Sequence, residues 1–196
     1  DPLRALAEDL LAMEETDALL VVTGAGVSLA SGIPTFRGSD PDAVWAKDTT
    51  TRGTYRFFAI DPVSSWLWYL SRFESLAGAK PNPAHHALVD LERWQIERGG
   101  DVLLVTQNID GLHRAAGSER LVEVHGRADR VRCDRIGCEN AAPRGSLSRA
   151  EVDIASFLAA PSRATVPRCP SCGALLRPHV LWFDETYTEH VDYGFG

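Results

Sequence analysis

A short apolar run that ends in a glycine turn restricts the possible folds of this chain more than any other feature. The run is Ala18–Thr23, it is rich in β-branched residues, and Gly24-Ala25-Gly26 follows it. Such a run is typical of a fully buried parallel strand. A helix is predicted to begin near Ser28. A strand, a glycine turn and a helix start together form the opening of a nucleotide-binding α/β unit.

The same alternation of strands and helices continues along the chain. The apolar periodicity and the Pro and Gly positions predict helices over 2–15, 62–77, 82–98 and 110–116, and strands over 102–106 and 121–124. This alternation favours an α/β fold with a parallel sheet and right-handed crossovers. Residues 38–61 show no clear period and are rich in polar and turn residues, so we predict a long mobile loop there.

Composition narrows the class of protein. The 196 residues carry a formal net charge of −7 at pH 7, and the pI is about 5.3. The chain lacks the overall basic footprint of a nucleic-acid-binding protein, and it has no apolar stretch of about 20 residues that would cross a membrane. No signal peptide is evident at Asp1, and the basic residues are almost all arginine. We therefore expect a cytoplasmic, bacterial protein.

Four cysteines form two close pairs and predict a metal site. They are Cys133, Cys138, Cys169 and Cys172. Spacings of four and two residues suit tetrahedral zinc, and four thiolates would close the coordination, which makes the zinc structural rather than catalytic. The alternative is four free cysteines in a core. The segment from about Asp129 to residue 176 is polar and contains all four cysteines. We therefore predict that it is a small zinc module inserted into the α/β domain.

The glycine turn alone does not decide the function. The third glycine of a dinucleotide-binding fingerprint is missing, because Leu29 occupies its place. The segment continues, however, as G-A-G-V-S-L-A-S-G-I-P-T-F-R-G over residues 24–38, which resembles the signature of the sirtuins, the NAD-dependent protein deacylases. Three further segments are similar to sirtuin motifs in the same order: 106–113, His125-Gly126, and 177–185, where Asp184 replaces the family's usual glycine.

The resemblance implies a domain organisation. A Rossmann-like NAD-binding domain is expected over 1–128 and 177–196, with the zinc-binding module over 129–176. Within the first range, 38–80 is expected to be a flexible loop followed by a helical part of the small domain. Val180–Phe183 is expected to form a strand that pairs with the substrate backbone.

The resemblance also implies the roles of individual residues. His125 corresponds to the family's catalytic base, and Asn108 is expected to assist the reaction; without the resemblance, a lone histidine would more often be structural. His85 is interpreted as a packing residue at a helix start. NAD is expected to contact Gly24, Ala25, Gly26, Ser28, Phe36, Arg37, Gln107, Asn108, Asp110 and His125, and an acyl-lysine protein or peptide to contact Val180, Trp182 and Phe183.

Tyr69 and Arg72 suggest which acyl group is removed. They lie three residues apart on a predicted helix, so both project from one face. Their spacing resembles the Y-x-x-R of sirtuins that remove succinyl or malonyl groups, and a guanidinium can hold a carboxylate with two hydrogen bonds. The alternative is an exposed arginine beside a packing tyrosine. The sequence leaves three alternatives to this function. They are a plain lysine deacetylase, an NAD glycohydrolase or ADP-ribosyltransferase, and a zinc-ribbon binding module without catalysis.

Overall fold

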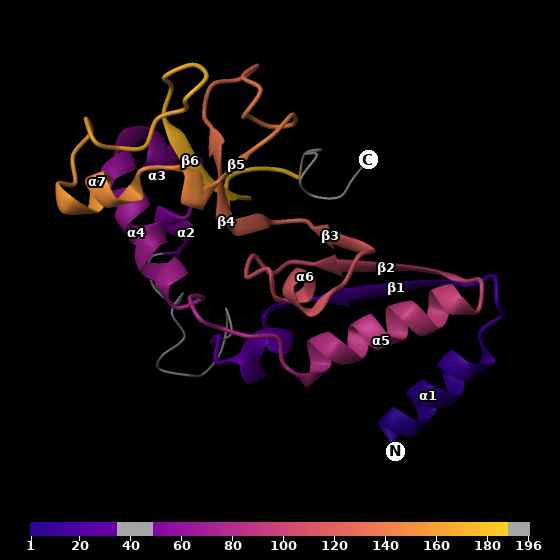
Figure 1. The fold of residues 1–196 in the computed structure, drawn as a ribbon. Coiled ribbons are helices and arrows are strands. Elements are labelled where there is room, and N and C mark those ends of the chain that lie inside the picture. Colours follow the sequence, from indigo (N-terminus) through magenta and orange to yellow (C-terminus); the bar gives the residue numbers. More distant parts are fainter. Residues whose placement is uncertain (35–48, 188–196) are drawn as a thin grey trace.

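Two three-stranded sheets organise the chain in the computed structural model, which describes residues 1–34 and 49–187 (Figure 1). The first sheet is parallel, with the order β1 (Ala18–Thr23), β2 (Asp101–Thr106), β3 (Leu121–Glu123). The second is antiparallel, with β4 (Gly126–Cys133) between β5 (Leu147–Ser148) and β6 (Leu176–Val180). The predicted α/β class and its parallel sheet are confirmed. Within the described ranges, no helix combines the length and apolar character of a bilayer span.

Helices cover one face of the parallel sheet. Helix α5 (Pro83–Glu97) packs against β2, and α6 (Leu112–Ala116) lies beside α5 (Figure 1). Helix α1 (Pro2–Ala12) is joined to the end of α5 through Arg98, whose guanidinium donates to the carbonyls of Leu10 and Met13. The glycine turn after β1 continues as a 3-10 helix, η1 (Ala25–Ser31), which begins three residues before the predicted helix start near Ser28.

The prediction that Ala18–Thr23 is fully buried is wrong. Exposed and half-buried residues alternate along β1, and Leu20 and Val22 are 62% and 60% exposed. Leu20 is in register with Leu103 of β2, which is 41% exposed, so these side chains share one face of the sheet. Among the described residues, no helix packs on that face. An apolar run thus identified the strand correctly but not its burial.

Two helix starts follow directly from capping residues. Asp61 accepts a hydrogen bond from the Ser64 amide at 3.0 Å and begins α4 (Pro62–Glu74). Asn82 accepts from the Ala84 amide at 2.9 Å, and the His85 ring accepts from the Asn82 amide, which completes a capping box. Proline follows each cap, where its missing N–H costs nothing. The predicted starts of both helices are confirmed.

The predicted loop over 38–61 is partly wrong. Residues 49–60 form two short helices, α2 (Thr49–Arg52) and α3 (Tyr55–Ile60), whereas 38–48 lie outside the described residues. Helices of four and six residues are too short to show a hydrophobic period. Their order comes from tertiary packing: the Phe58 ring is 1% exposed and lies 5.2 Å from the Trp182 ring.

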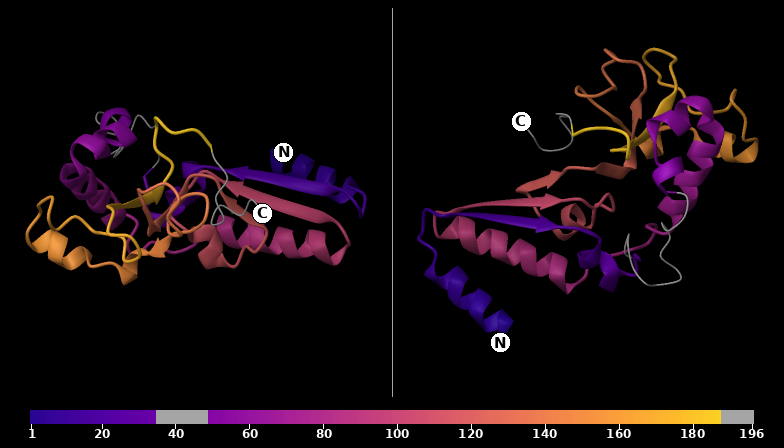
Figure 2. Two further views of the ribbon diagram at one scale, coloured as in Figure 1. Left: turned by 90° about the horizontal axis from the view of Figure 1, so that it is seen from above. Right: turned by 180° about the vertical axis from the view of Figure 1, so that it is seen from behind.

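The largest hydrophobic core lies around the second sheet and not around the parallel one. Helix α4 packs against β6, and the indole N–H of Trp66 donates to the Leu176 carbonyl at 2.9 Å. The short 3-10 helix η2 (Arg149–Glu151) is followed by α7 (Ile154–Ala159). Phe157 of α7 is completely buried in the same core. Figure 2 shows this assembly at one end of the molecule and the parallel sheet with α5 at the other.

Strand β6 joins the second sheet. It pairs with β4 over Arg177 and its neighbours, although the sequence grouped residues 177–196 with the Rossmann-like part. Alternation of strands and helices could not place this strand, because its partner β4 is far away along the chain. The domain boundaries themselves stay a prediction.

Asn82 connects α5 to the turn that follows β1. Besides capping its own helix, its side-chain amide donates to the Val27 carbonyl at 2.8 Å and to the Ser31 hydroxyl at 2.9 Å. Replacing Asn82 with Ala should therefore lower the free energy of unfolding by about 2–3 kcal/mol. Asp61→Ala, which removes a cap without such a connection, should cost about 1 kcal/mol. Urea denaturation of both variants measures the difference, and equal losses would contradict the connecting role of Asn82.

Candidate active site

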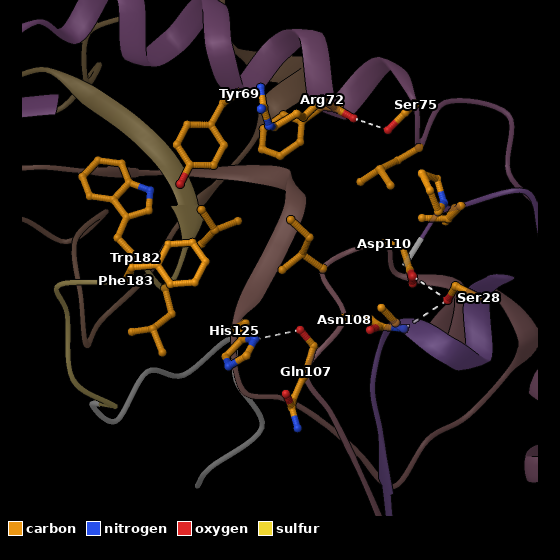
Figure 3. A pocket seen from close by; sticks show the side chains of 18 of the residues that line it. Ser28, Tyr69, Arg72, Ser75, Gln107, Asn108, Asp110, His125, Trp182 and Phe183 are labelled. Atoms are coloured by element: carbon orange, nitrogen blue, oxygen red, sulfur yellow. Dashed lines mark hydrogen bonds between the residues drawn. The ribbon is translucent and has the colours of Figure 1, made fainter. Parts of the chain in front are cut away.

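A cavity of about 750 Å³ opens where the carboxyl ends of the parallel strands face α4 and the segment after β6 (Figure 3). This end of a parallel sheet is where α/β folds bind their ligands. Twelve of the predicted site residues line it: Ala25, Gly26, Ser28, Tyr69, Arg72, Gln107, Asn108, Asp110, His125, Val180, Trp182 and Phe183. Phe36 and Arg37 lie outside the described residues.

A polar network forms one side of the cavity. The buried Ser28 hydroxyl donates to an Asp110 carboxylate oxygen at 2.7 Å, and the Asn108 side-chain amide donates to the Ser28 oxygen at 3.0 Å (Figure 3). The same Asn108 amide donates to the Gly24 carbonyl at 3.2 Å, which places Gly24 at the edge of the site. The network holds the turn after β1 against the segment after β2.

The glycine turn leaves open space. A Cβ atom added at Gly24 or at Gly26 would meet no described atom within 4 Å. The backbone there can therefore be approached closely by a bound molecule, which a side chain would hinder. The family resemblance expects NAD at this turn, and that contact stays a prediction.

Two histidines pack behind this side of the cavity. His85 and His113 are almost completely buried, and their rings lie 4.8 Å apart. His113 Nε2 lies 2.9 Å from the Thr23 hydroxyl. Burial lowers the pKa of both rings, that of His113 to about 4, so both are neutral at pH 7. The placement of His85 agrees with the packing role predicted for it.

His125 is oriented by a hydrogen bond to the backbone of Gln107. Its Nδ1 lies 2.8 Å from the Gln107 carbonyl oxygen, which can only accept, so Nδ1 carries the proton and Nε2 is the accepting nitrogen (Figure 3). Burial lowers the pKa of His125 and outweighs the hydrogen bond to Gln107, which raises it. The ring is thus neutral at pH 7, with a basic nitrogen available at the cavity.

Sequence reasoning missed Tyr187. Its hydroxyl lies 2.9 Å from His125 Nε2, its ring is stacked at 5.8 Å from the imidazole, and it lines the cavity. Since Nε2 accepts, the tyrosine hydroxyl donates. Tyr187 follows the last motif without any local pattern of its own, so only the folded chain places it against His125.

The motif over 177–185 is held together by an ion pair between the buried Arg177 and the half-buried Glu185. Arg177 donates to both Glu185 oxygens, at 2.5 and 2.8 Å, and its guanidinium carbon lies 3.4 Å from the centre of the Trp182 ring. Burial would raise the pKa of Glu185, but Arg177 and Arg132 outweigh it and lower the pKa. The pair holds Trp182, and with it Phe183, at the cavity.

The prediction of a strand over 180–183 is wrong beyond its first residue, because β6 covers Leu176–Val180 and ends there. The Leu181 amide donates to the His125 carbonyl at 2.9 Å, and the Phe183 amide donates to the Gly53 carbonyl at 3.0 Å. His125 directly precedes β4, whereas Gly53 lies between α2 and α3, so the chain leaves β4 between Leu181 and Phe183.

Tyr69 and Arg72 both line the cavity from α4, and the Tyr69 hydroxyl points into it (Figure 3). Tyr69 is 4% exposed, and its burial raises the pKa of the phenol, which therefore stays protonated. The Arg72 guanidinium carbon lies 3.6 Å from the centre of the Trp68 ring, and Nη1 donates to the Trp68 carbonyl at 3.2 Å. The structure thus brings the pair to the cavity, and its role stays a prediction.

The four cysteines fit a tetrahedral metal ion. Their Sγ atoms lie within 4.8 Å of one another, with Cys133 and Cys172 at 3.4 Å and Cys138 and Cys169 at 3.7 Å. Zinc bonded to sulfur at about 2.3 Å requires sulfur–sulfur distances of about 3.8 Å. The Asn140 side chain and the Arg135 amide donate to sulfur atoms, as groups around a thiolate site do. The donor set is therefore compatible with a closed, structural zinc site.

Comparison with known proteins identifies the family. The sequence profile of the Sir2 family matches residues 24–194. The chain belongs to the Sir2 family. It is 43% identical over 178 residues to a protein of Thermus thermophilus named NAD-dependent protein deacylase, and 40% identical over 178 residues to one of the same name from Pyrococcus furiosus. These alignments cover 90% of this chain and 63% and 65% of the relatives, so the chain spans less than two thirds of their length.

Solved Sir2 structures share the fold. A complex of a Sir2 homologue with NAD aligns with a TM-score of 0.69 at 38% identity, covering 93% of this chain and 63% of that one. A complex of Sir2 with a p53 peptide and NAD⁺ aligns with a TM-score of 0.67 at 30% identity, covering 93% and 65%. The predicted sirtuin family and the Rossmann-like sheet with an inserted cysteine module are thereby confirmed.

We expect zinc removal to unfold the cysteine module. Three of the four cysteines are buried within the large core, and structural zinc binding contributes directly to folding. A strong chelator should shift the tryptophan fluorescence to the red as Trp66 and Trp182 become hydrated. Added zinc should reverse the shift. Purified protein that is folded but free of zinc, as measured by atomic emission, would contradict the assignment.

Proposed function

We propose that this chain carries the catalytic site of an NAD-dependent protein lysine deacylase. The observation that carries the proposal is the neutral His125, whose accepting Nε2 lies at a cavity bounded by the open glycine turn and by the segment after β6. The names of the Sir2 relatives and the NAD and peptide complexes of its structural neighbours support it.

The residues around the glycine turn fit NAD. When bound, NAD supplies the ribose carbon and hydroxyls to which the acyl group is transferred, with release of nicotinamide. The open space at Gly24 and Gly26 accommodates the cofactor, and Asn108 and Asp110 present polar groups at the same side. Ala25, Ser28 and Gln107 complete the proposed contacts. Phe36 and Arg37 are proposed from the family motif alone.

His125 is the proposed general base. A hydroxyl that reaches its Nε2 can transfer a proton to it, because Nδ1 is already occupied by the Gln107 carbonyl. At present the Tyr187 hydroxyl donates to the same nitrogen, so a substrate hydroxyl has to replace it. Asn108 is proposed to assist by fixing the polar network next to the reacting groups.

The acyl-lysine protein or peptide is proposed to enter along the segment after β6. Val180, Trp182 and Phe183 line the cavity there, and Phe183 is 51% exposed, so its ring is available for contact. This wall favours deacylation over the alternative of an NAD glycohydrolase, which needs no peptide site. A plain deacetylase would use the same wall, so only the acyl pocket separates these two possibilities.

We further propose that acidic acyl groups are accepted. Tyr69 and Arg72 enter the cavity from one face of α4, and a guanidinium with a neutral phenol can hold a carboxylate. Stacking on Trp68 restricts the Arg72 side chain, which reduces the entropy lost on binding. Removal of acetyl groups is compatible with the same site.

Replacement of His125 by Ala tests the reaction. A deacylation assay with an acyl-lysine peptide panel, read by mass spectrometry, should detect O-acyl-ADP-ribose only when NAD is present. The variant should lose about 10²- to 10⁴-fold in kcat, because a general base is removed. NAD affinity, measured by calorimetry, should change little. Near-normal turnover would remove His125 from the mechanism.

The pH profile provides a second measurement on His125. The base must be neutral to accept a proton, and burial lowers its pKa from 6.5. The rate should therefore be constant around neutral pH and fall only on the acidic side, with the midpoint below 6.5. A midpoint above that value would show that the imidazole is not in the buried, neutral state described.

Replacement of Arg72 by Met tests the acyl preference. A lost charge-assisted bidentate pair should lower kcat/KM for a succinyl-lysine peptide by about ten- to hundredfold. The loss should lie mainly in KM, because the carboxylate is held alike in the ground and transition states. Deacetylation by the same preparation is the control for structural damage. An equal fall in both activities would contradict a carboxylate-binding role for Arg72.

A further inference from the structure

Asp184 occupies the position at which the sirtuin motif has glycine, and the structure gives its carboxylate a defined partner. One oxygen accepts from the Tyr55 amide at 2.6 Å and the other from the Arg56 amide at 3.0 Å. Tyr55 and Arg56 are the first two residues of α3. The added side chain therefore does not fill the cavity but binds a neighbouring helix.

The contact completes the hydrogen bonding at the start of α3. The first amides of a helix lack partners within the helix. Thr54 caps the third one through its side-chain oxygen, which accepts from the Phe57 amide at 3.2 Å. Asp184 satisfies the two that Thr54 cannot reach. Its negative charge also lies at the positive end of the peptide dipoles.

Trp182 and Phe183 form the aromatic wall of the cavity, and the carboxylates of Asp184 and Glu185 attach this wall to two different parts of the fold. Glu185 is bound by Arg177 of β6 and Arg132 of β4, whereas Asp184 is bound by α3. Next to Asp184, the Phe183 amide donates to the Gly53 carbonyl. Trp182 and Phe183 are therefore fixed both to the second sheet and to the helix pair α2–α3.

The packing around this junction is close. The Trp182 ring lies 6.0 Å from Tyr55 and 5.2 Å from Phe58, both on α3. A Cβ atom at Gly53 would lie 3.0 Å from the Phe183 ring, so a side chain there would displace the wall. Movement of α3 would consequently be transmitted to the two aromatic side chains that line the cavity.

We propose that Asp184 is a positioning residue for substrate: it fixes Trp182 and Phe183 through α3 and thereby preorganises the acyl-lysine peptide site. This inference rests on the proposed deacylase function. Preorganised walls bind more tightly because less conformational freedom is lost on binding. Glycine at this position would leave two α3 amides to water and would free the turn between Phe183 and Glu185.

Thr54 offers a matched control. Thr54→Ala also removes a cap from α3, but it leaves the connection between α3 and the cavity wall intact. If Asp184 acted only by stabilising α3, both variants would affect the peptide equally. Asp184→Asn, which keeps one accepting oxygen, should lie between the wild type and Asp184→Gly.

The experiment compares the wild type with Asp184→Gly, Asp184→Asn and Thr54→Ala, each as the 196-residue chain. Fluorescence anisotropy of a labelled acyl-lysine peptide gives its Kd, steady-state kinetics give separate KM values for peptide and NAD, and thermal denaturation gives the stability. Asp184→Gly should raise the peptide Kd and KM by about fivefold with the KM for NAD unchanged. Thr54→Ala should lower stability to a similar extent and leave the peptide Kd unchanged.

The possible results separate the positioning role of Asp184 from the proposed deacylase reaction. An unchanged peptide Kd in Asp184→Gly, or an equal rise in Thr54→Ala, overturns the positioning role while leaving the deacylase proposal intact. A wild type that binds the peptide without turning it over overturns the proposed reaction, and the Kd series still decides the role of Asp184. A wild type that binds no acyl-lysine peptide overturns both.

Discussion

The close approach of two backbones at Gly126 is the constraint on which the rest of the structure depends. The chain passes there from the parallel sheet into the second sheet, with a φ of +79°, and a Cβ atom would lie 2.2 Å from the His179 carbonyl oxygen. Only glycine combines this conformation with this contact. Immediately beyond it the Leu181 amide donates to the His125 carbonyl, so the two sheets are joined at the candidate base.

This junction explains why the cavity has two chemically different sides. The parallel sheet contributes the glycine turn and the polar network of Ser28, Asn108 and Asp110, which suit a polar cofactor. The second sheet and α4 contribute an aromatic wall, which suits an acyl chain and a peptide. His125 lines the cavity together with residues of both sides.

The two carboxylates next to the aromatic wall, Asp184 and Glu185, both have partners within the protein. Glu185 is paired with Arg177 and Arg132, and Asp184 with the amides of α3. Arg177 and Arg132 are buried, and a buried charge without a partner would be costly, so their pairing with Glu185 fixes the position of the wall. The positively charged Arg72 reaches the cavity from another element, α4, and it is the side chain that gives the acyl end of the site its proposed selectivity.

The sequence by itself determined the features that arise from interactions between close neighbours. The caps Asp61 and Asn82 fixed two helix starts, the spacing of Cys133 to Cys172 indicated the metal site, and the motifs named the cavity residues and the family. Only the tertiary structure decided the exposure of β1, the pairing of β6 with β4, the helices α2 and α3, and the contact of Tyr187 with His125. The physical reason is sequence distance. Asp184 and Tyr55 are 129 residues apart, and such a hydrogen bond leaves no local pattern because it depends on the path of the whole chain between them.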